Sequence, residues 1–405
     1  MSNPNENAKV FLAFSDTTRL GILDLLRGGE QSATDLQAHI NMRQSTLSHH
    51  MKILVESGVV AARKSGKWTY YSISEAGSAY AAGLVKLLTS NISMYSNAAS
   101  TQKRRTNPMK SFTIVADTSC DLPQDYLDAH NIKLIQIPFT VDGVDKNSHD
   151  ISLKTFYDAL RGGSTAKTSL INPDVFTDVF TEYAKNDEDM LCIILSSGLS
   201  ATFQSAQIAL GQVQDAYPGC NIFPIDSIGA TAINGLLVML AAQKRAEGLT
   251  AAQTAAWLEE KKHSLIGLFT VNDLMYLHRG GRLSKLSAIG GSLLSIKPVL
   301  NIQPDGTLAL KNKARGRNAA LKMLVDQLLR SIAPGTSLNT VIIPHTDCEA
   351  DAYKLAEMIK AAVPVQEVIV TMMGPVIGAH VGPGAIAVVF EGDMTREAYE
   401  AKFYK

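Results

Sequence analysis

The stretch Leu191-Cys-Ile-Ile-Leu-Ser-Ser-Gly-Leu-Ser-Ala-Thr-Phe-Gln-Ser205 decides the fold of the larger part of this chain. Its leading apolar residues predict a buried strand of a parallel sheet, because both faces of such a strand are covered. The loop that follows carries Ser196, Ser197 and Ser200, and a helix-like run over 201–213 comes next. In open α/β sheets, ligands bind beyond the carboxyl ends of the strands, and helix N-termini attract anions. Locally, two interpretations stay open: serines that cap the helix, or a pocket for a carboxylate or phosphate.

Strand and helix patterns alternate throughout residues 111–393. The expected strands are Phe112–Ala116, Leu134–Val141, Leu191–Leu195, Cys220–Ile225, Ser264–Val271, Thr340–Pro344, Glu367–Thr371 and Ala385–Phe390. The expected helices are Gln124–His130, Ser152–Arg161, Asp174–Ala184, Ala201–Val213, Arg317–Ile332 and Glu349–Ala362. This alternation predicts an α/β domain of parallel sheets with helices on both faces. We expect two lobes, about 111–263 and 264–393, with a cleft for a small molecule between them.

Length and composition limit the class of protein. The 405 residues predict about two or three domains, and the longest apolar runs are too short to span a membrane. With a polar N-terminus that does not resemble a signal peptide, we expect a cytoplasmic protein without a membrane span. The four cysteines, Cys120, Cys192, Cys220 and Cys348, lie far apart and are expected to be reduced core thiols.

The N-terminal segment differs from the rest in charge. Residues 1–105 carry 12 Lys and Arg against 7 Asp and Glu, whereas the remainder carries 26 against 31. This excess favours a polyanionic partner for the N-terminal segment. Apolar spacing predicts one helix over Lys9–Leu26, closed by Gly28 and Gly29. Two further helices, Ser32–Ile40 and Ser45–Ser57, flank a short break and form a helix-turn-helix.

The second helix of this motif is expected to read DNA. Opposite the apolar residues Leu47, Met51 and Leu54 it has a polar face of Ser45, Thr46, Ser48, His49 and Lys52. Such a face suits hydrogen bonds to base edges and phosphates in the major groove. Val59–Ile73 then reads as two alternating strands around a basic turn, where Arg63, Lys64 and Lys67 predict a wing that contacts DNA. We therefore expect a winged-helix DNA-binding domain over 1–97 and a basic linker over 98–110.

This N-terminal segment resembles the ArsR/SmtB family of small winged-helix repressors over about 5–95. The resemblance rests on the wing and on two stretches, Phe14-Ser-Asp-Thr-Thr-Arg-Leu-Gly-Ile-Leu-Asp-Leu-Leu and Ser45-Thr-Leu-Ser-His-His-Met-Lys-Ile-Leu-Val-Glu-Ser-Gly-Val. It implies a homodimer on double-stranded operator DNA, with the expected helix Leu84–Tyr95 paired with its symmetry mate. Ser32–Ile40, the helix before the recognition helix, has no cysteine, so we expect no thiolate metal sensor and no bound metal.

The larger part resembles the DegV family of fatty-acid-binding proteins over about 112–393. The matching motifs are Asp117–Leu122, Lys167–Ser169, Ser196–Thr202, Arg279–Lys285, Leu293–Leu300 and Gly378–Gly384. The resemblance implies a two-lobed α/β domain that binds a long-chain fatty acid between its lobes, without a cofactor and without turnover. We expect residues 394–405 to form a C-terminal tail.

The same resemblance implies which residues hold the ligand. The fatty-acid carboxylate is expected on Thr168, with Ser169 beside it, and on Ser200 and His380. After Ser169 this chain has Leu-Ile-Asn-Pro where the family usually has Gln-Pro, so the shape of that loop is expected to differ. Taken without the resemblance, His380 also suits a core histidine that fixes a glycine turn. In members that serve a fatty-acid kinase, arginines at the positions of Arg282 and Arg315 help to engage the kinase.

We therefore expect a fatty-acid-responsive transcriptional regulator rather than an enzyme. One alternative is a subunit that presents acyl chains to a fatty-acid kinase. A serine esterase is the other alternative, because Gly198-Leu-Ser-Ala-Thr202 lacks only the last glycine of Gly-x-Ser-x-Gly and His380 follows downstream. Against it, no acid partner is evident near His380 in the sequence.

Overall fold

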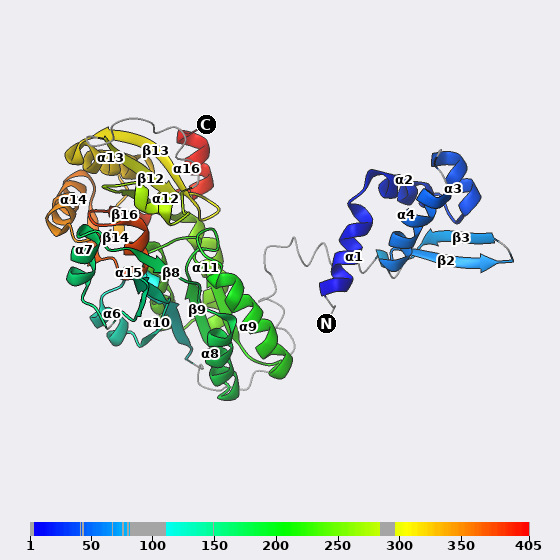
Figure 1. Ribbon diagram of the computed structural model, residues 1–405, viewed down its shortest axis with the longest axis horizontal. Coiled ribbons are helices and arrows are strands. Elements are labelled where there is room, and N and C mark those ends of the chain that lie inside the picture. The colour runs from blue at the N-terminus through cyan, green and yellow to red at the C-terminus, as the bar shows by residue number, and fades with distance from the viewer. Residues whose placement is uncertain are drawn as a thin grey trace. The chain divides into compact units, whose positions relative to one another are not determined.

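The structure, a computed structural model, describes residues 4–40, 42, 44–66, 68–74, 77–78, 81, 111–148, 150–283 and 296–404. The chain divides into two compact units, Met1–Gln102 and Lys103–Lys405, and each is described by itself (Figure 1). The expected helix Leu84–Tyr95, the expected linker 98–110 and Lys67 lie outside the described residues. So does 284–295, which holds parts of two DegV-like motifs.

The N-terminal unit is a winged helix. Its helices are α1 (Pro4–Phe14), α2 (Thr17–Leu26), α3 (Ala33–Ile40) and α4 (Gln44–Glu56). Its strands are β1 (Gln31–Ser32), β2 (Val60–Ser65) and β3 (Trp68–Ile73), which pair antiparallel in the order β1-β3-β2. The helices and the strands share one apolar core, in which Leu47, Met51 and Leu54 of α4 are buried as expected.

The single helix predicted over Lys9–Leu26 is wrong, because the chain breaks between α1 and α2. Asp16 caps α2, since its Oδ1 accepts the Arg19 N–H at 3.0 Å. The Arg19 guanidinium is buried and donates to the carbonyls of Leu12 at 2.8 Å and Ala13 at 3.3 Å, which satisfies the end of α1. The apolar periodicity of the sequence continues across the break between α1 and α2. The sequence signal for the break is therefore the capping residue Asp16.

The first sheet of the larger unit is parallel, as expected, in the order β10-β9-β4-β5. Its strands are β4 (Thr113–Asp117), β5 (Ile132–Ile135), β9 (Met190–Ile194) and β10 (Ile222–Asp226). The helices of this lobe are α6 (Gln124–Ala129), α7 (Leu153–Arg161), α8 (Pro173–Lys185), α9 (Thr202–Ala216), α10 (Ala232–Ala246) and α11 (Ala251–Lys261).

A small antiparallel sheet lies beside it, in the order β7-β6-β8. Its strands are β6 (Phe139–Val141), β7 (Val144–Lys146) and β8 (Ala166–Thr168). The single strand expected over Leu134–Val141 is therefore divided between β5 and β6. Pro138 lies at this division, where it lacks the N–H that a continuing ladder needs.

The second large sheet corrects the expectation of parallel pairing. Its order is β13-β12-β11-β16-β14-β15, and only β14 and β15 pair parallel. Its strands are β11 (Leu265–Thr270), β12 (Ile296–Ile302), β13 (Leu308–Arg315), β14 (Leu338–His345), β15 (Val365–Met372) and β16 (Ile386–Glu391). The unpredicted hairpin β12–β13 turns at Asp305-Gly306, a dipeptide that favours hairpin turns.

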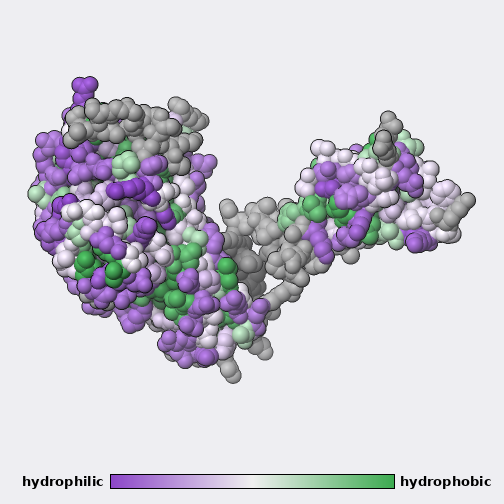
Figure 2. All heavy atoms as spheres, in the orientation of Figure 1, coloured by the Kyte–Doolittle hydropathy of each residue, from purple (hydrophilic) through white to green (hydrophobic). Residues whose placement is uncertain are grey.

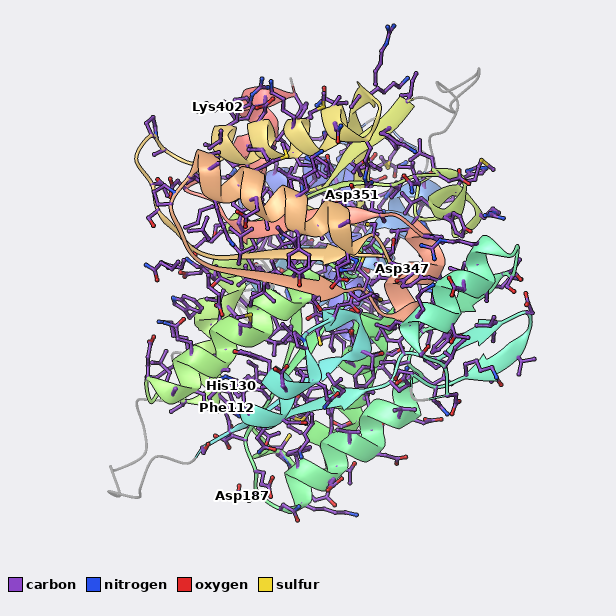
Figure 3. The ribbon with its side chains drawn as sticks, turned by 90° about the vertical axis from the view of Figure 1, so that its left-hand side faces the viewer. Phe112, His130, Asp187, Asp347, Asp351 and Lys402 are labelled. Atoms are coloured by element: carbon purple, nitrogen blue, oxygen red, sulfur yellow. The ribbon has the colours of Figure 1, made fainter. Side chains whose placement is uncertain are left out.

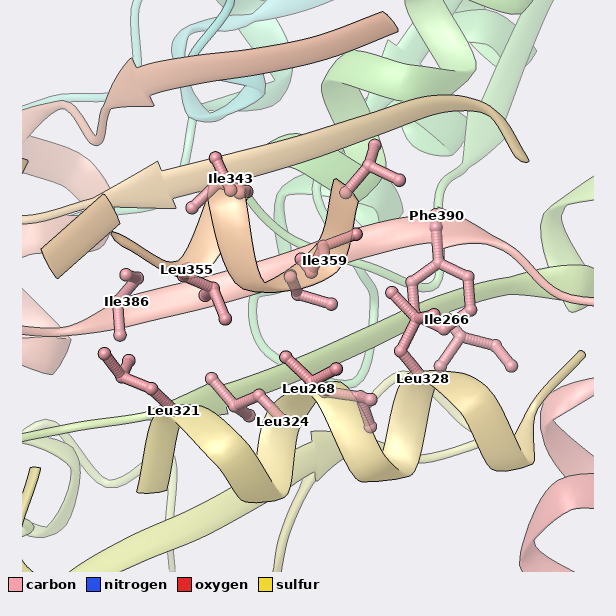
Figure 4. Close-up of a cluster of buried hydrophobic side chains, with 14 of the residues drawn as sticks. Ile266, Leu268, Leu321, Leu324, Leu328, Ile343, Leu355, Ile359, Ile386 and Phe390 are labelled. Atoms are coloured by element: carbon pink, nitrogen blue, oxygen red, sulfur yellow. The ribbon is translucent and has the colours of Figure 1, made fainter. Parts of the chain in front are cut away.

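Two helices, α13 (Arg317–Arg330) and α14 (Glu349–Ala362), pack on this second sheet. Leu324 and Leu328 of α13 and Ile359 of α14 meet Phe390 of β16 in one core (Figure 4). The segment 394–405, expected as a tail, contains helix α16 (Arg396–Phe403) instead. Tyr399 of α16 is buried in the same core, so this segment is part of the fold.

Leu328 and Leu329 are a matched pair for testing this core, because Leu328 is 0 % exposed and its neighbour 38 %. We expect Leu328→Ala to lower the free energy of unfolding by about 2–5 kcal/mol through the lost burial and the cavity left behind. Leu329→Ala should change it by about 0.5 kcal/mol or less. Urea unfolding of the two variants measures this difference, and equal losses would contradict the described packing.

Candidate functional site

His380 lies on a short helix, α15 (Pro375–Val381), which runs from the end of β15 into the region between the lobes. The interpretation of this segment as a glycine turn is wrong. Pro375 occupies the first helical turn and Gly382, at φ 68°, ends the helix. Proline inside a helix start and glycine just past its end are the usual pair of boundary residues, so this helix could have been predicted.

Thr168 and His380 meet although they are far apart in the sequence. Thr168 ends β8, and its Oγ1 lies 2.7 Å from His380 Nε2. Burial, and to a smaller extent the positive charge of Arg282, lower the pKa of His380 to about 4. The imidazole is therefore neutral at pH 7, and its Nδ1 has no hydrogen-bond partner among the described residues.

Ser200 lies at the start of α9 and also reaches a cavity, so both interpretations of its loop fit the structure. Its Oγ lies 2.9 Å from Thr202 Oγ1 and accepts the Thr202 N–H at 3.3 Å, at the start of α9. The same side chain also lines the cavity described below. Ser196 is different: it is fully buried and donates to the Gly306 carbonyl, so it holds the loop in place.

These groups line a cavity in the larger unit with about 860 Å³ of empty space, part of it open to solvent. Thr168, Ser169, Ser200, Arg282 and His380 all reach it, as the predicted carboxylate site requires. Most of the remaining wall is apolar, with Ile137, Leu195, Leu199, Phe269, Leu277, Ile302, Leu308, Val376, Ile377, Val381 and Val389.

Arg282, which the family resemblance implies only as a kinase contact, also lies in this wall. Its Nε donates to the Leu199 carbonyl at 3.1 Å and its Nη1 to the Gly280 carbonyl. Burial lowers the pKa of its guanidinium, which lines both the main cavity and an adjoining hollow with Lys167 and Arg279. Arg315, the other expected kinase contact, is exposed at the end of β13 and does not line the cavity.

The polar face of α4 is exposed as expected, comprising Ser45, Thr46, Ser48, His49 and Lys52. On the wing, Lys64 is exposed. Arg63 donates to both carboxylate oxygens of Glu30, at 3.1 and 2.6 Å, and lies over the Tyr70 ring. This ion pair orients Arg63 and occupies part of its donor capacity.

The described residues contain no group of three His, Cys, Asp or Glu side chains placed to hold a metal ion. No helix among them is long and apolar enough to cross a membrane. All four cysteines are free: Cys120 and Cys192 are buried, and Cys220 and Cys348 are partly exposed.

Residues 111–393 match the family model for uncharacterised proteins of the DegV family. A DegV domain-containing protein of Clostridium perfringens is 38% identical over 288 residues, which cover 70% of this chain and 99% of that protein. This chain belongs to the DegV family. Residues 16–62 match the model for bacterial regulatory proteins of the arsR family, so the chain joins an ArsR-type helix-turn-helix to a DegV domain.

Solved DegV structures agree with this fold. A DegV lipid-binding protein from Thermotoga maritima superposes with a TM-score of 0.62 at 28% identity, covering 71% of this chain and 100% of that one. A DegV family protein from Thermus thermophilus, described as binding fatty acid, gives 0.64 at 26% identity, with 70% and 99% covered. The two-lobed α/β architecture of the DegV domain is thereby confirmed.

The low pKa of His380 gives a pH prediction. Because its pKa is about 4 in the folded protein against an ordinary 6.5, the unfolded chain takes up this proton first as the pH falls. The stability difference between wild type and His380→Gln should therefore be constant above pH 6.5 and shrink as the pH falls toward 4. The imidazole NMR signal missing from His380→Gln should titrate near 4, and titration near 6.5 would contradict the buried site.

Proposed function

We propose that the cavity binds a long-chain fatty acid whose carboxylate lies beside Thr168, Ser200 and His380. The observation that carries this proposal is the hydrogen-bonded pair of Thr168 and His380 in the wall of a largely apolar cavity. Ser169, Ser200 and Arg282 line the same cavity. The solved relatives described as fatty-acid binding proteins support the choice of ligand.

The carboxylate and the alkyl chain of such a ligand contribute differently to its binding free energy. An unpaired buried carboxylate would cost several kcal/mol. Two hydroxyls and an imidazole offset that cost, since hydrogen bonds to charged groups contribute about 1.5–3 kcal/mol each. Arg282 adds a positive charge on the same wall. Each buried CH₂ contributes about 0.8 kcal/mol, so the polar groups orient the ligand and the alkyl chain supplies most of the affinity.

We infer that the N-terminal unit binds double-stranded operator DNA as a homodimer. The exposed polar face of α4 suits the major groove, and Lys64 on the wing suits phosphate contacts. The side chains of Phe11, Leu12 and Phe14 on α1 and Leu20 on α2 are 37–49 % exposed. They give this unit an apolar surface over α1 (Figure 2), which a second copy of the unit would cover.

Together these proposals make the protein a cytoplasmic transcriptional regulator whose operator affinity responds to fatty acid. Ligand and operator must then change each other's affinity by the same factor. The presence of an ArsR-type helix-turn-helix favours this function over a subunit that only presents acyl chains to a fatty-acid kinase. In that alternative, Arg315 would remain available for the kinase, because its side chain is exposed.

The esterase alternative needs a histidine that activates Ser200. In the described residues, His380 Nε2 is bonded to Thr168, whereas the Ser200 hydroxyl is bonded to Thr202. Among the residues that the structure describes, His380 Nδ1 also has no carboxylate that would orient it for base catalysis. These contacts therefore favour fatty-acid binding over ester hydrolysis as the function of the cavity.

Ser200 and Ser197 test the ligand site as a matched pair, because both lie in the loop after β9 but only Ser200 lines the cavity. Ser200→Ala should weaken palmitate binding about tenfold to a hundredfold by removing one hydrogen bond to the carboxylate. Ser197→Ala should leave it unchanged. Titration calorimetry with delipidated protein measures both, and a wild type that binds no palmitate would refute the proposal.

A further inference from the structure

Arg396, the first residue of α16, is a buried cation outside the ligand cavity. Its side chain is 2 % exposed, and α16 lies beyond residues 111–393 that the DegV family model matches. Its guanidinium has no hydrogen-bonded carboxylate among the described residues and donates to backbone carbonyls instead. Buried arginines are rare unless they are paired with an acid, so the burial of Arg396 must be compensated by other interactions.

The three carbonyls that Arg396 binds belong to segments far apart in the sequence. Nη1 donates to Ile228, after β10, and to Gln303, after β12, the latter at 3.1 Å. Nη2 donates at 2.9 Å to Lys262, in the turn that joins α11 to β11. One planar group thus joins the first lobe, the second lobe and the connection between them.

The segment that begins at Ile228 is strained. Ile228 has φ 42°, and Thr231 has φ 50° with ψ −125°, although both are β-branched. Such residues rarely adopt positive φ, and strain of this kind persists only where surrounding contacts hold it. Here Asp226 Oδ1 accepts the Ile228 N–H at 2.9 Å, and Arg396 holds the carbonyl of the same residue.

This strained segment forms part of the ligand cavity. Ala230 and Thr231 line it directly, and so does Ile302, next to the Gln303 carbonyl that Arg396 also binds. The Gly229 carbonyl accepts the N–H of Ser196 at 2.9 Å, which connects the segment to the loop that carries Ser200. Arg396 therefore touches the backbone of two cavity walls without reaching the cavity.

We propose that Arg396 is a positioning residue for the ligand: it holds the Ile228–Thr231 segment in the strained conformation that completes the cavity wall. The inference rests on the proposed binding of an acyl chain in that cavity. By linkage, a ligand that needs this wall must also stabilise the docking of α16. The C-terminal helix is then part of the ligand sensor.

The test compares Arg396→Met and Arg396→Lys with two controls in the full-length chain. Glu397→Gln changes an exposed neighbour on α16, and Ile359→Val loosens a buried core position that does not line the cavity. We expect Arg396→Met to weaken palmitate binding by about tenfold or more, as for one lost hydrogen bond to a charged group. Arg396→Lys should recover part of this loss, and both controls should bind like wild type.

Hydrogen exchange separates positioning from general destabilisation. In the ligand-free protein, Arg396→Met should speed exchange in 226–231 selectively, and palmitate should slow exchange in 396–403 of the wild type. A variant whose melting temperature falls while its palmitate affinity and its 226–231 exchange match Ile359→Val would overturn the inference. If the wild type binds no palmitate, the proposed function fails, and the ligand-free exchange comparison still decides the role of Arg396.

Discussion

The buried carboxylate of Asp117 fixes the backbone frame on which the candidate ligand site depends. Its side chain is at the end of β4 and is 1 % exposed. Oδ2 accepts the Leu195 N–H at 2.6 Å, and Oδ1 accepts the Ser119 N–H at 2.9 Å and the Asn234 amide at 3.3 Å. Burial raises the pKa of this acid, and the hydrogen bonds from Ser119 and Leu195 oppose that rise. A carboxylate so surrounded holds β4, β9 and α10 together immediately before the loop that carries Ser200 begins.

A second set of contacts brings the other half of the site to this frame. Asp121, in the first lobe, accepts the N–H of Gly374 at 2.7 Å, at the start of α15 in the second lobe. Tyr157 of α7 donates to the Met373 carbonyl at 2.6 Å. Arg161 of the same helix pairs with Asp347, a residue labelled in Figure 3. The candidate site therefore lies where the two lobes meet. Thr168 and Ser200 come from the first lobe, whereas Arg282 and His380 come from the second.

Hydrophobic patterns in the sequence predict the strands whose formation depends on local burial. The apolar runs at 190–194, 222–226, 265–270 and 386–391 are strands because both of their faces are buried. Hydrophobic patterning does not predict the hairpin β12–β13, because its half-exposed strand β13 carries polar residues. The Asp305-Gly306 turn is the local signal for it. The cavity position of Arg282 could not be read from the sequence, because its carbonyl partner at Leu199 is distant in the chain. The family resemblance implies that Thr168, Ser200 and His380 form one site. Hydrophobic periodicity alone does not predict that these three residues lie close together.

We propose that this chain couples an acyl-binding cavity to a DNA-binding helix. The most direct measurement determines the operator affinity of the full-length protein with and without saturating palmitate, and the palmitate affinity with and without operator DNA obtained by selection. If the two sites are coupled, both affinities change by one common factor, on the order of 5–150. An operator affinity that palmitate leaves unchanged, in protein shown to bind both, would contradict this proposal.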